Sequence, residues 1–209
     1  MTAAHELANA LAELGAATVG ESGGLPMAPR LKATWSGARL AGPAYTVACA
    51  PADNLAIHVA VAQASAGRVL VVDASAIPDR GYWGEVLTTG AEARRLAGLV
   101  IDGGVRDASA LEAHRFPVFS ALIALRGASK NGPGSVGGTV EVGDVRVAPG
   151  DWVVADADGV TVVPLDELDS VLAAGRARAA KEDGFFRDLK AGKTTMDLLS
   201  LDASRITGA

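Results

Sequence analysis

Two short stretches of the sequence hold residue types that can bind a divalent cation and a small anion together. Glu85 follows Gly84 at the start of a helical pattern. Arg106 and Asp107 stand side by side after the stretch VIDGGV (Val100–Val105), which is an apolar run followed by an acid, two glycines and a valine. Carboxylates are oxygen ligands of the kind that Mg²⁺ and Mn²⁺ prefer, and a guanidinium holds a carboxylate through two parallel donors. The three charged side chains therefore predict a site for a hard cation and an anionic substrate.

Each of these residues also has an ordinary structural explanation. The helix dipole stabilises an acid such as Glu85 in a first turn, Asp107 can cap a helix that begins at Ala108, and a single arginine is most often a solvated surface charge. Their positions favour a site, because both stretches follow a buried strand and ligands gather at the carboxyl ends of strands in open α/β sheets. We predict a tight turn at Gly103–Gly104, which lets the neighbours Arg106 and Asp107 face one pocket.

Alternating strands and helices must position these residues in the first half of the chain. Apolar runs bounded by turn residues predict strands at Ala44–Ala50, Arg68–Ala74, Leu99–Asp102 and Phe116–Ser120. Helical patterns predict helices at Glu6–Leu14 (ended by Gly15), Asn54–Ala64, Gly84–Leu96 and Asp107–His114, with Ser75–Trp83 as a loop.

After Arg126 the pattern changes to hairpins followed by a long charged helix. Turn residues within alternating segments predict hairpins at Thr139–Val147 and Trp152–Val163, and the helix is predicted over Leu165–Ala191. The sequence therefore predicts a single α/β domain over residues 1–209 with mixed parallel and antiparallel strand pairing. We expect the final helix to reach past its own core to another subunit.

Composition and charge exclude several classes of protein. A formal net charge of -5 and a pI of about 5.2 argue against a nucleic-acid partner. The sequence has no run of about 18 or more apolar residues, so we expect no membrane span. Its first residues are acidic and helical in pattern rather than a signal peptide. The single cysteine, Cys49, cannot form an internal disulfide, which is typical of a cytoplasmic protein.

Other motifs point to common structural roles. The three histidines, His5, His58 and His114, lack the spacing of zinc ligands, and we interpret His58 as a satisfied interior or edge residue. The glycine pattern at Gly132–Gly137 precedes a hairpin, and the Walker-like Ala191–Thr195 follows a helix. Neither has the strand-to-helix context that phosphate-binding loops require.

The stretch from Trp83 to Ser120, WGEVLTTGAEARRLAGLVIDGGVRDASALEAHRFPVFS, resembles the core signature of a known family. That family includes the 4-hydroxy-4-methyl-2-oxoglutarate/4-carboxy-4-hydroxy-2-oxoadipate aldolases and the regulator of ribonuclease E activity. Further matches are GPAYTV, RVLVVDA, PGDWVVADADGVTVVP and the charged final helix. The resemblance covers most of the chain and implies a swivelling-domain-like α/β/β/α sandwich that forms trimers or hexamers with active sites between subunits.

The resemblance also implies roles for individual residues. In the aldolases of this family, the residue that matches Asp107 binds a divalent cation, here Mg²⁺ or Mn²⁺, and the residue that matches Arg106 contacts pyruvate. The turn at Gly84 would bind the substrate, with the backbone amides of Val86 and Leu87 receiving the pyruvate carboxylate. A helix N-terminus suits such a carboxylate because its first N–H groups are free.

Two acids are implied to act on water bound to the cation. Glu85 would hold that water and let it take the proton from a substrate hydroxyl. A second acid would come from the C-terminal helix of a neighbouring subunit, and Glu182 is our candidate, with Asp183 and Glu167 as alternatives.

The implied function is a metal-dependent lyase that cleaves a carbon–carbon bond of a 2-oxo acid through a pyruvate enolate. Oxaloacetate decarboxylation passes through the same enolate. Two alternatives stay open: a non-catalytic, protein-binding regulator of RNA degradation, and an aldolase-like enzyme for an unusual substrate. The second arises because Ser120–Gly127 departs from the Arg-Gly that follows PVFA in many relatives. Retention of Glu85, Arg106 and Asp107 together favours the enzyme.

Overall fold

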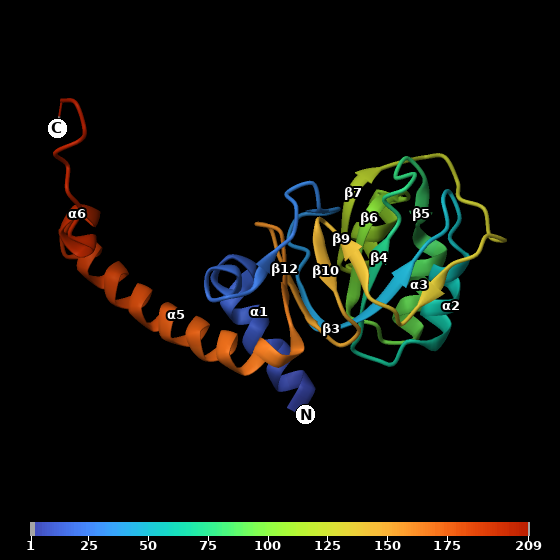
Figure 1. Ribbon diagram of the computed structural model, residues 1–209, viewed down its shortest axis with the longest axis horizontal. Coiled ribbons are helices and arrows are strands. Elements are labelled where there is room, and N and C mark those ends of the chain that lie inside the picture. The colour runs from blue at the N-terminus through green and yellow to red at the C-terminus, as the bar shows by residue number, and fades with distance from the viewer. Residues whose placement is uncertain (1–2, 209) are drawn as a thin grey trace.

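A ten-stranded sheet organises residues 3–208, the part of the chain that the computed structural model describes (Figure 1). The strand order is β1-β12-β11-β3-β4-β6-β7-β2, with β5 paired to β6 and β8 to β3, and β9 and β10 form a separate hairpin. The strands are β1 (Leu25–Pro26), β2 (Lys32–Ala33), β3 (Leu40–Ala48), β4 (Val69–Asp73), β5 (Gly81–Trp83), β6 (Gly98–Val105), β7 (Val118–Ile123), β8 (Ser135–Val136), β9 (Val140–Val142), β10 (Val145–Val147), β11 (Trp152–Ala155) and β12 (Val160–Val163).

The helices are α1 (Ala3–Glu21), α2 (Leu55–Gln63), α3 (Glu85–Ala93), α4 (Ala108–His114), the 3₁₀ turn η1 (Leu165–Glu167), α5 (Leu168–Lys190) and α6 (Thr195–Leu199). Helices α1 to α4 and the start of the C-terminal helix α5 cover the outside of this sheet. Figure 1 shows α2 and α3 beside the parallel strands, whereas α1 and the start of α5 lie beside β12. None of the helices within residues 3–208 is long and apolar enough to cross a membrane.

Three hydrophobic cores separate these layers. One lies between α2, α3 and the parallel strands and contains Ile57 and Leu99. A second joins the parallel strands to β9, β11 and β12 and contains Phe119. The third lies under α1 and α5 and contains Leu11 and Trp152. Because β4 and β6 are covered on both faces, their sequences are near-continuous apolar runs, which Asp102 interrupts in β6. The prediction of an α/β fold with mixed pairing is confirmed.

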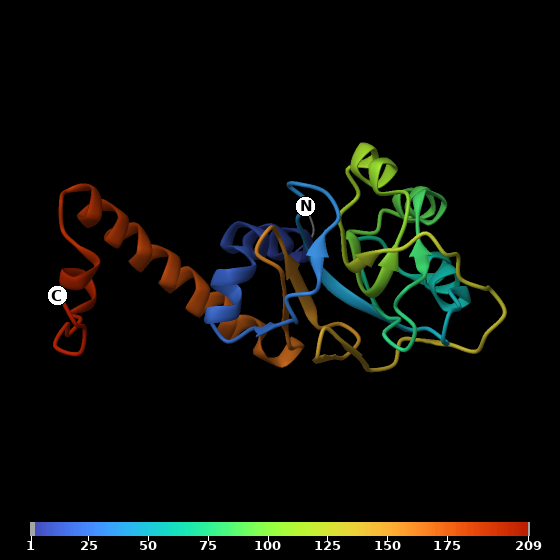
Figure 2. The ribbon, with the colours of Figure 1, turned by 90° about the horizontal axis from the view of Figure 1, so that it is seen from above.

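Helix α5 leaves the body of the protein after its first turns. Its buried residues, Leu168, Val171 and Gly175, all lie near its start. Both ribbon views show the rest of α5 extending away from the sheet, with α6 near its far end (Figures 1 and 2). The helix thus extends beyond its own core, as the sequence predicts.

The first helix ends at Gly15 as predicted, because the backbone is non-helical there (φ 81°, ψ 161°), but a second helical segment that the sequence pattern does not predict follows directly within α1. The backbone amide of Ala16 donates to Oδ2 of Asp156 at 2.8 Å, so an acid far away in the sequence caps the second segment. The predicted loop Ser75–Trp83 contains strand β5, whose three residues are too short a run for a periodic signal.

The predicted turn at Gly103–Gly104 is also wrong. Strand β6 continues through both glycines, and the chain turns at Asp107, which adopts a left-handed conformation (φ 58°, ψ 37°). Gly104 is required for close packing instead. A Cβ at this position would lie 2.5 Å from the carbonyl oxygen of Arg80 and 2.8 Å from Cβ of Ala124. The neighbouring segments therefore approach β6 closely just before the predicted site.

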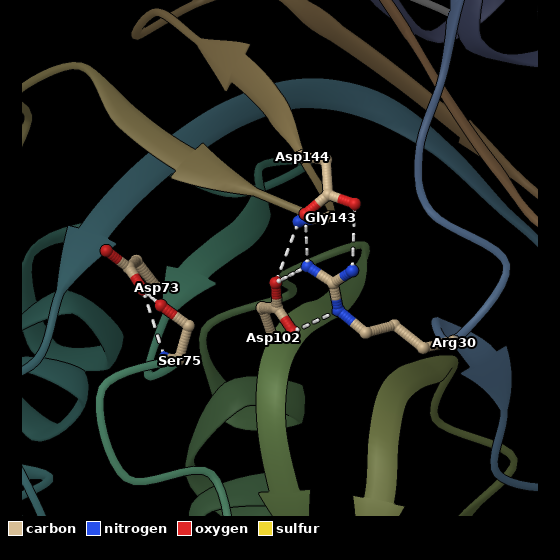
Figure 3. Close-up of polar contacts among 6 residues, drawn as sticks. All are labelled: Arg30, Asp73, Ser75, Asp102, Gly143 and Asp144. Carbon is tan, nitrogen blue, oxygen red and sulfur yellow. Dashed lines mark hydrogen bonds and ion pairs between the residues drawn. The ribbon is translucent and has the colours of Figure 1, made fainter.

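A buried carboxylate inside β6 ties two loops to the sheet (Figure 3). Asp102 accepts hydrogen bonds from Arg30 Nε (3.0 Å) and Nη2 (2.7 Å) and from the amide of Gly143 (2.9 Å). Arg30 also contacts Asp144 at 2.7 Å. Gly143 and Asp144 form the turn of the β9–β10 hairpin, so Asp102 anchors that hairpin as well as the Arg30 loop.

We predict that Asp102→Asn lowers the free energy of unfolding by about 2 kcal/mol, because it weakens the charge-assisted hydrogen bonds that the buried Asp102 carboxylate accepts from Arg30 and Gly143. The matched control is Asp144→Asn, which removes the exposed partner of the same arginine and should cost no more than about 1 kcal/mol. The Asp102 side chain is 6% exposed and that of Asp144 is 71% exposed. Urea unfolding measures both, and equal losses would contradict the assignment of Asp102 as the anchor.

Candidate functional site

A cavity of about 150 Å³ lies at the carboxyl ends of β5 and β6. Five residues that the sequence assigns to the site line it: Gly84, Val86, Leu87, Arg106 and Asp107. The cavity is smaller than the roughly 300–1,000 Å³ of sites for drug-sized ligands. It therefore suits a small organic acid better than a nucleotide cofactor.

Asp107 is held against the first turn of α3. Its Oδ2 accepts a hydrogen bond from the amide of Glu85 at 3.1 Å and lies 3.7 Å from Nε of Arg106. It occupies the N-cap position of α4, as predicted, yet within the described chain its side chain makes no capping hydrogen bond to that helix. The left-handed backbone at Asp107 directs the carboxylate to α3 instead.

Gly84 makes this approach possible. Its backbone is extended (φ -169°), so conformation alone would allow any residue. A Cβ on Gly84 would, however, collide with Oδ2 of Asp107 and would lie 3.1 Å from Cγ of Arg106. The first-turn amides of Val86 and Leu87 stand next to this contact, and N–H groups at such positions have no partner within their own helix.

Arg106 is positioned through its backbone. Its amide donates to the carbonyl of Trp83 at 2.9 Å, which joins the end of β6 to the end of β5. Its half-exposed side chain reaches the cavity beside Asp107. The prediction that the neighbours Arg106 and Asp107 face one pocket is thus in agreement with the geometry, although the turn that achieves it lies at Asp107.

Glu85 lies beside the cavity and is not among the residues that line it. Its Oε1 is 3.6 Å from Nε2 of His114, whose Nδ1 is 2.8 Å from Oε2 of Glu92. The hydrogen bond to Glu92 raises the pKa of His114, with Glu85 adding to the effect. No sequence pattern pairs His114 with Glu92, because the contact joins residues near the ends of two separate helices.

Glu182 is not brought to the cavity within one chain. It lies on α5 beyond the buried start of that helix, and its Oε1 pairs with Nε of Arg178 at 2.9 Å. In Figures 1 and 2 this part of α5 runs away from β5 and β6. Its assignment to the site depends on a second subunit and stays a prediction.

The lining of the cavity also includes Asn54 and His58 from the start of α2 and Lys130 from the loop after β7. Asn54 is 5% exposed and donates from Nδ2 to the carbonyl of Tyr82 at 2.7 Å. Its Oδ1 and the Nε2 of His58 are buried and have no hydrogen-bond partner in the described part of the chain. The prediction of a satisfied His58 is therefore wrong for Nε2, because the ring borders the cavity.

Asp53 fixes the loop that carries Lys130. Its carboxylate accepts hydrogen bonds from the amides of Leu55 (2.8 Å), Asn131 (2.7 Å) and Gly132 (2.8 Å) and from Oγ of Ser129 (2.8 Å). Burial alone would raise the pKa of Asp53, but these hydrogen bonds outweigh it and lower the pKa to about 2. An ionised Asp53 thus anchors the loop to the start of α2 at neutral pH.

The donor set restricts which cation the site could hold. Within residues 3–208, no group of three or more His, Cys, Asp or Glu side chains could hold a metal ion. Asp107 alone offers a carboxylate at the cavity wall. A single carboxylate fits Mg²⁺, which keeps several waters and commonly takes remaining ligands from its substrate, and it does not fit a structural zinc site.

Comparisons with known proteins agree with this fold. The chain is 37% identical over 145 residues to a protein of Halalkalibacterium halodurans provisionally named 4-hydroxy-4-methyl-2-oxoglutarate aldolase, covering 69% of each chain. A solved structure of an uncharacterised protein from Pseudomonas syringae pv. tomato matches with a TM-score of 0.84 and 26% identity, over 96% of this chain and 95% of that one.

A second solved structure, described as the RNA-processing inhibitor RraA from Thermus thermophilis, matches with a TM-score of 0.61 and 30% identity. It covers 68% of this chain and 84% of that one. The sequence pattern of the RraA-like family, described as Aldolase/RraA, matches residues 9–162. This protein therefore belongs to the RraA-like aldolase family.

Proposed function

We propose that the protein is a divalent-metal-dependent lyase that cleaves a carbon–carbon bond of a 2-oxo acid and releases pyruvate. The substrate would be of the 4-hydroxy-4-methyl-2-oxoglutarate type, with oxaloacetate decarboxylation as a second activity. The observation that carries the proposal is the placement of Arg106 and Asp107 beside the free N-terminus of α3 in one small cavity. The name of the relative from Halalkalibacterium halodurans supports the same substrate class.

Different residues of the cavity would bind different parts of the substrate. The first-turn amides of Val86 and Leu87 would bind the carboxylate of the 2-oxo acid, with Gly84 leaving room for it. Arg106 would donate to the 2-oxo oxygen and stabilise the negative charge that develops there when the bond breaks. Asp107 would hold Mg²⁺ or Mn²⁺, which supplies Lewis-acid stabilisation of the enolate charge.

Two structural features are part of the proposal. The chain would adopt the swivelling-domain-like α/β/β/α sandwich and assemble as a homotrimer or homohexamer. The extended part of α5 would then carry Glu182 to the cavity of a neighbouring subunit, where the acid and Glu85 would orient water at the cation. A cytoplasmic location fits this chemistry.

The test is a coupled assay of pyruvate release from 4-hydroxy-4-methyl-2-oxoglutarate and from oxaloacetate. We expect turnover with Mg²⁺ or Mn²⁺ that a chelator abolishes and added metal restores. The similarity to the Thermus inhibitor favours a second candidate, a protein that binds and regulates an RNA-processing enzyme. Absence of metal-dependent turnover of both substrates would overturn the lyase and favour this regulator.

Arg106→Lys should lower kcat/KM by about 100-fold or more, because an ammonium cannot reproduce a planar double donor at the oxygen that becomes charged. Arg146→Lys on β10 is the matched control, since Arg146 is exposed and distant in the fold. Urea unfolding should show that both variants remain folded. Unchanged kinetics in Arg106→Lys would remove Arg106 from the site.

Gly84→Ala should displace the Asp107 carboxylate, because the new methyl group would occupy its position. We expect activity to fall by about 100-fold and the free energy of unfolding by about 1–3 kcal/mol. The control is Gly90→Ala in the same helix, whose Cβ would meet only Cγ1 of Val61 at 3.4 Å. That change should leave activity intact and should not destabilise the helix. Wild-type kinetics in Gly84→Ala would show that the contact is dispensable.

A further inference from the structure

A histidine at the end of α4 bridges two carboxylates of α3. Nε2 of His114 lies 3.6 Å from Oε1 of Glu85, and its Nδ1 lies 2.8 Å from Oε2 of Glu92. Glu85 is the first residue of α3 and Glu92 comes two helical turns later, so both acids lie on one face of that helix. The two ring nitrogens of an imidazole face different directions, which allows the single side chain of His114 to contact both acids.

The charges in this bridge match. An ionised carboxylate only accepts hydrogen bonds, and only the protonated imidazole donates from both of its nitrogens. The hydrogen bond to Glu92 raises the pKa of His114, and the contact with Glu85 raises it further, whereas burial opposes both effects. The two acids therefore favour the form of His114 that can hold both of them.

The two ends of the bridge differ in how firmly they are held. The contact between His114 and Glu92 is a direct hydrogen bond, and the Glu92 side chain is 36% exposed. The contact with Glu85 is longer, and the Glu85 side chain is 57% exposed. Glu92 thus fixes the imidazole ring, and the ring restrains the more exposed carboxylate of Glu85.

Glu85 has no other restraint on its carboxylate in the described chain. Its amide donates to Oδ2 of Asp107 at 3.1 Å, and its carbonyl accepts from Oγ1 of Thr89 at 3.0 Å, so its backbone is fixed. Among residues 3–208, His114 is the only side chain that forms an ion pair with Glu85. An exposed glutamate samples several rotamers. Without His114 the carboxylate would turn freely into solvent while the backbone stayed in place.

We propose that His114 is a positioning residue, which holds the carboxylate of Glu85 at the edge of the cavity so that it can direct water toward the cation. This inference rests on the proposed lyase function, in which Glu85 orients that water, and it adds the group that restrains Glu85. Groups that orient the residues around a metal change affinity or activity by about 10–100-fold. Such contacts are often long before the substrate binds and shorten in the complex, which fits the 3.6 Å separation.

The first test compares two substitutions of the histidine in the cleavage of 4-hydroxy-4-methyl-2-oxoglutarate with Mg²⁺. His114→Ala should lower kcat by about tenfold. KM should stay within about threefold, since Arg106 and the first turn of α3 would still bind the substrate. His114→Gln should recover part of the lost kcat, because the glutamine amide can donate from a position close to Nε2. The control is His5→Ala, which removes an exposed histidine of α1 and should match the wild type.

Action through Glu85 is tested with a double variant, because residues that act as one unit have non-additive effects. We expect Glu85→Gln alone to lower kcat by about tenfold or more. Adding His114→Ala to Glu85→Gln should then change kcat by less than about twofold. A further loss as large as the one that His114→Ala causes in the wild type would show that the histidine acts independently of Glu85.

The contact can also be measured without a cation or a substrate. In nitrogen NMR spectra of the metal-free protein, Glu85→Gln should shift the Nε2 resonance of His114 more than the Nδ1 resonance. Glu92→Gln should shift the Nδ1 resonance more than that of Nε2. A histidine that only packs between the two helices would show neither preference.

The possible results separate this inference from the proposed function. If the wild type turns over neither substrate, the lyase function fails, and the positioning role fails with it. If the wild type is active but His114→Ala keeps full kcat, or loses it independently of Glu85, the positioning role is wrong and the lyase function stands. An Nε2 resonance that does not respond to Glu85→Gln would also overturn the role of His114.

Circular dichroism should show that each variant is folded. If His114→Ala does not fold, Glu92→Gln makes the same test from the other end of the bridge. It should lower kcat in the wild type and leave kcat unchanged in Glu85→Gln. Equal losses in both backgrounds would contradict a bridge that acts on Glu85.

Discussion

The contact between the Asp107 carboxylate and the first turn of α3 determines the candidate site. The hydrogen bond from the amide of Glu85 to Oδ2 of Asp107 joins the turn after β6 to the helix after β5. This contact requires a left-handed backbone at Asp107 and no side chain at Gly84. Both conditions are local, yet they place a carboxylate, a guanidinium and free helix amides around one volume. An aspartate at this position commonly caps its own helix. Asp107 instead accepts a hydrogen bond from the amide of Glu85, and its carboxylate lines the cavity together with Arg106.

Two other buried carboxylates support the site from a distance, each in a different way. Asp102 holds the Arg30 loop and the β9–β10 hairpin against β6, the strand that delivers Arg106 and Asp107 (Figure 3). Asp53 holds the loop after β7 against the start of α2 and so keeps Lys130 beside the cavity. Each acid is fully supplied with donors, which is the condition under which a buried charge is stable. The strand that carries Arg106 and Asp107 and the loop that carries Lys130 thus have separate anchors.

The sequence predicts those features that depend on local patterns. The apolar runs that became β4 and β6 are covered on both faces, and the turn residues of the two late hairpins lie where the turns form. Arg106 and Asp107 were found because they follow such a run. The features that the sequence does not predict depend on contacts between residues that are far apart in the sequence. Asp156 restarts α1 beyond Gly15, β5 exists only through its pairing with β6, and the glycines of β6 serve packing. The free atoms of Asn54 and His58 carry no sequence signal, since an Asn and a His one turn apart are ordinary on a helix.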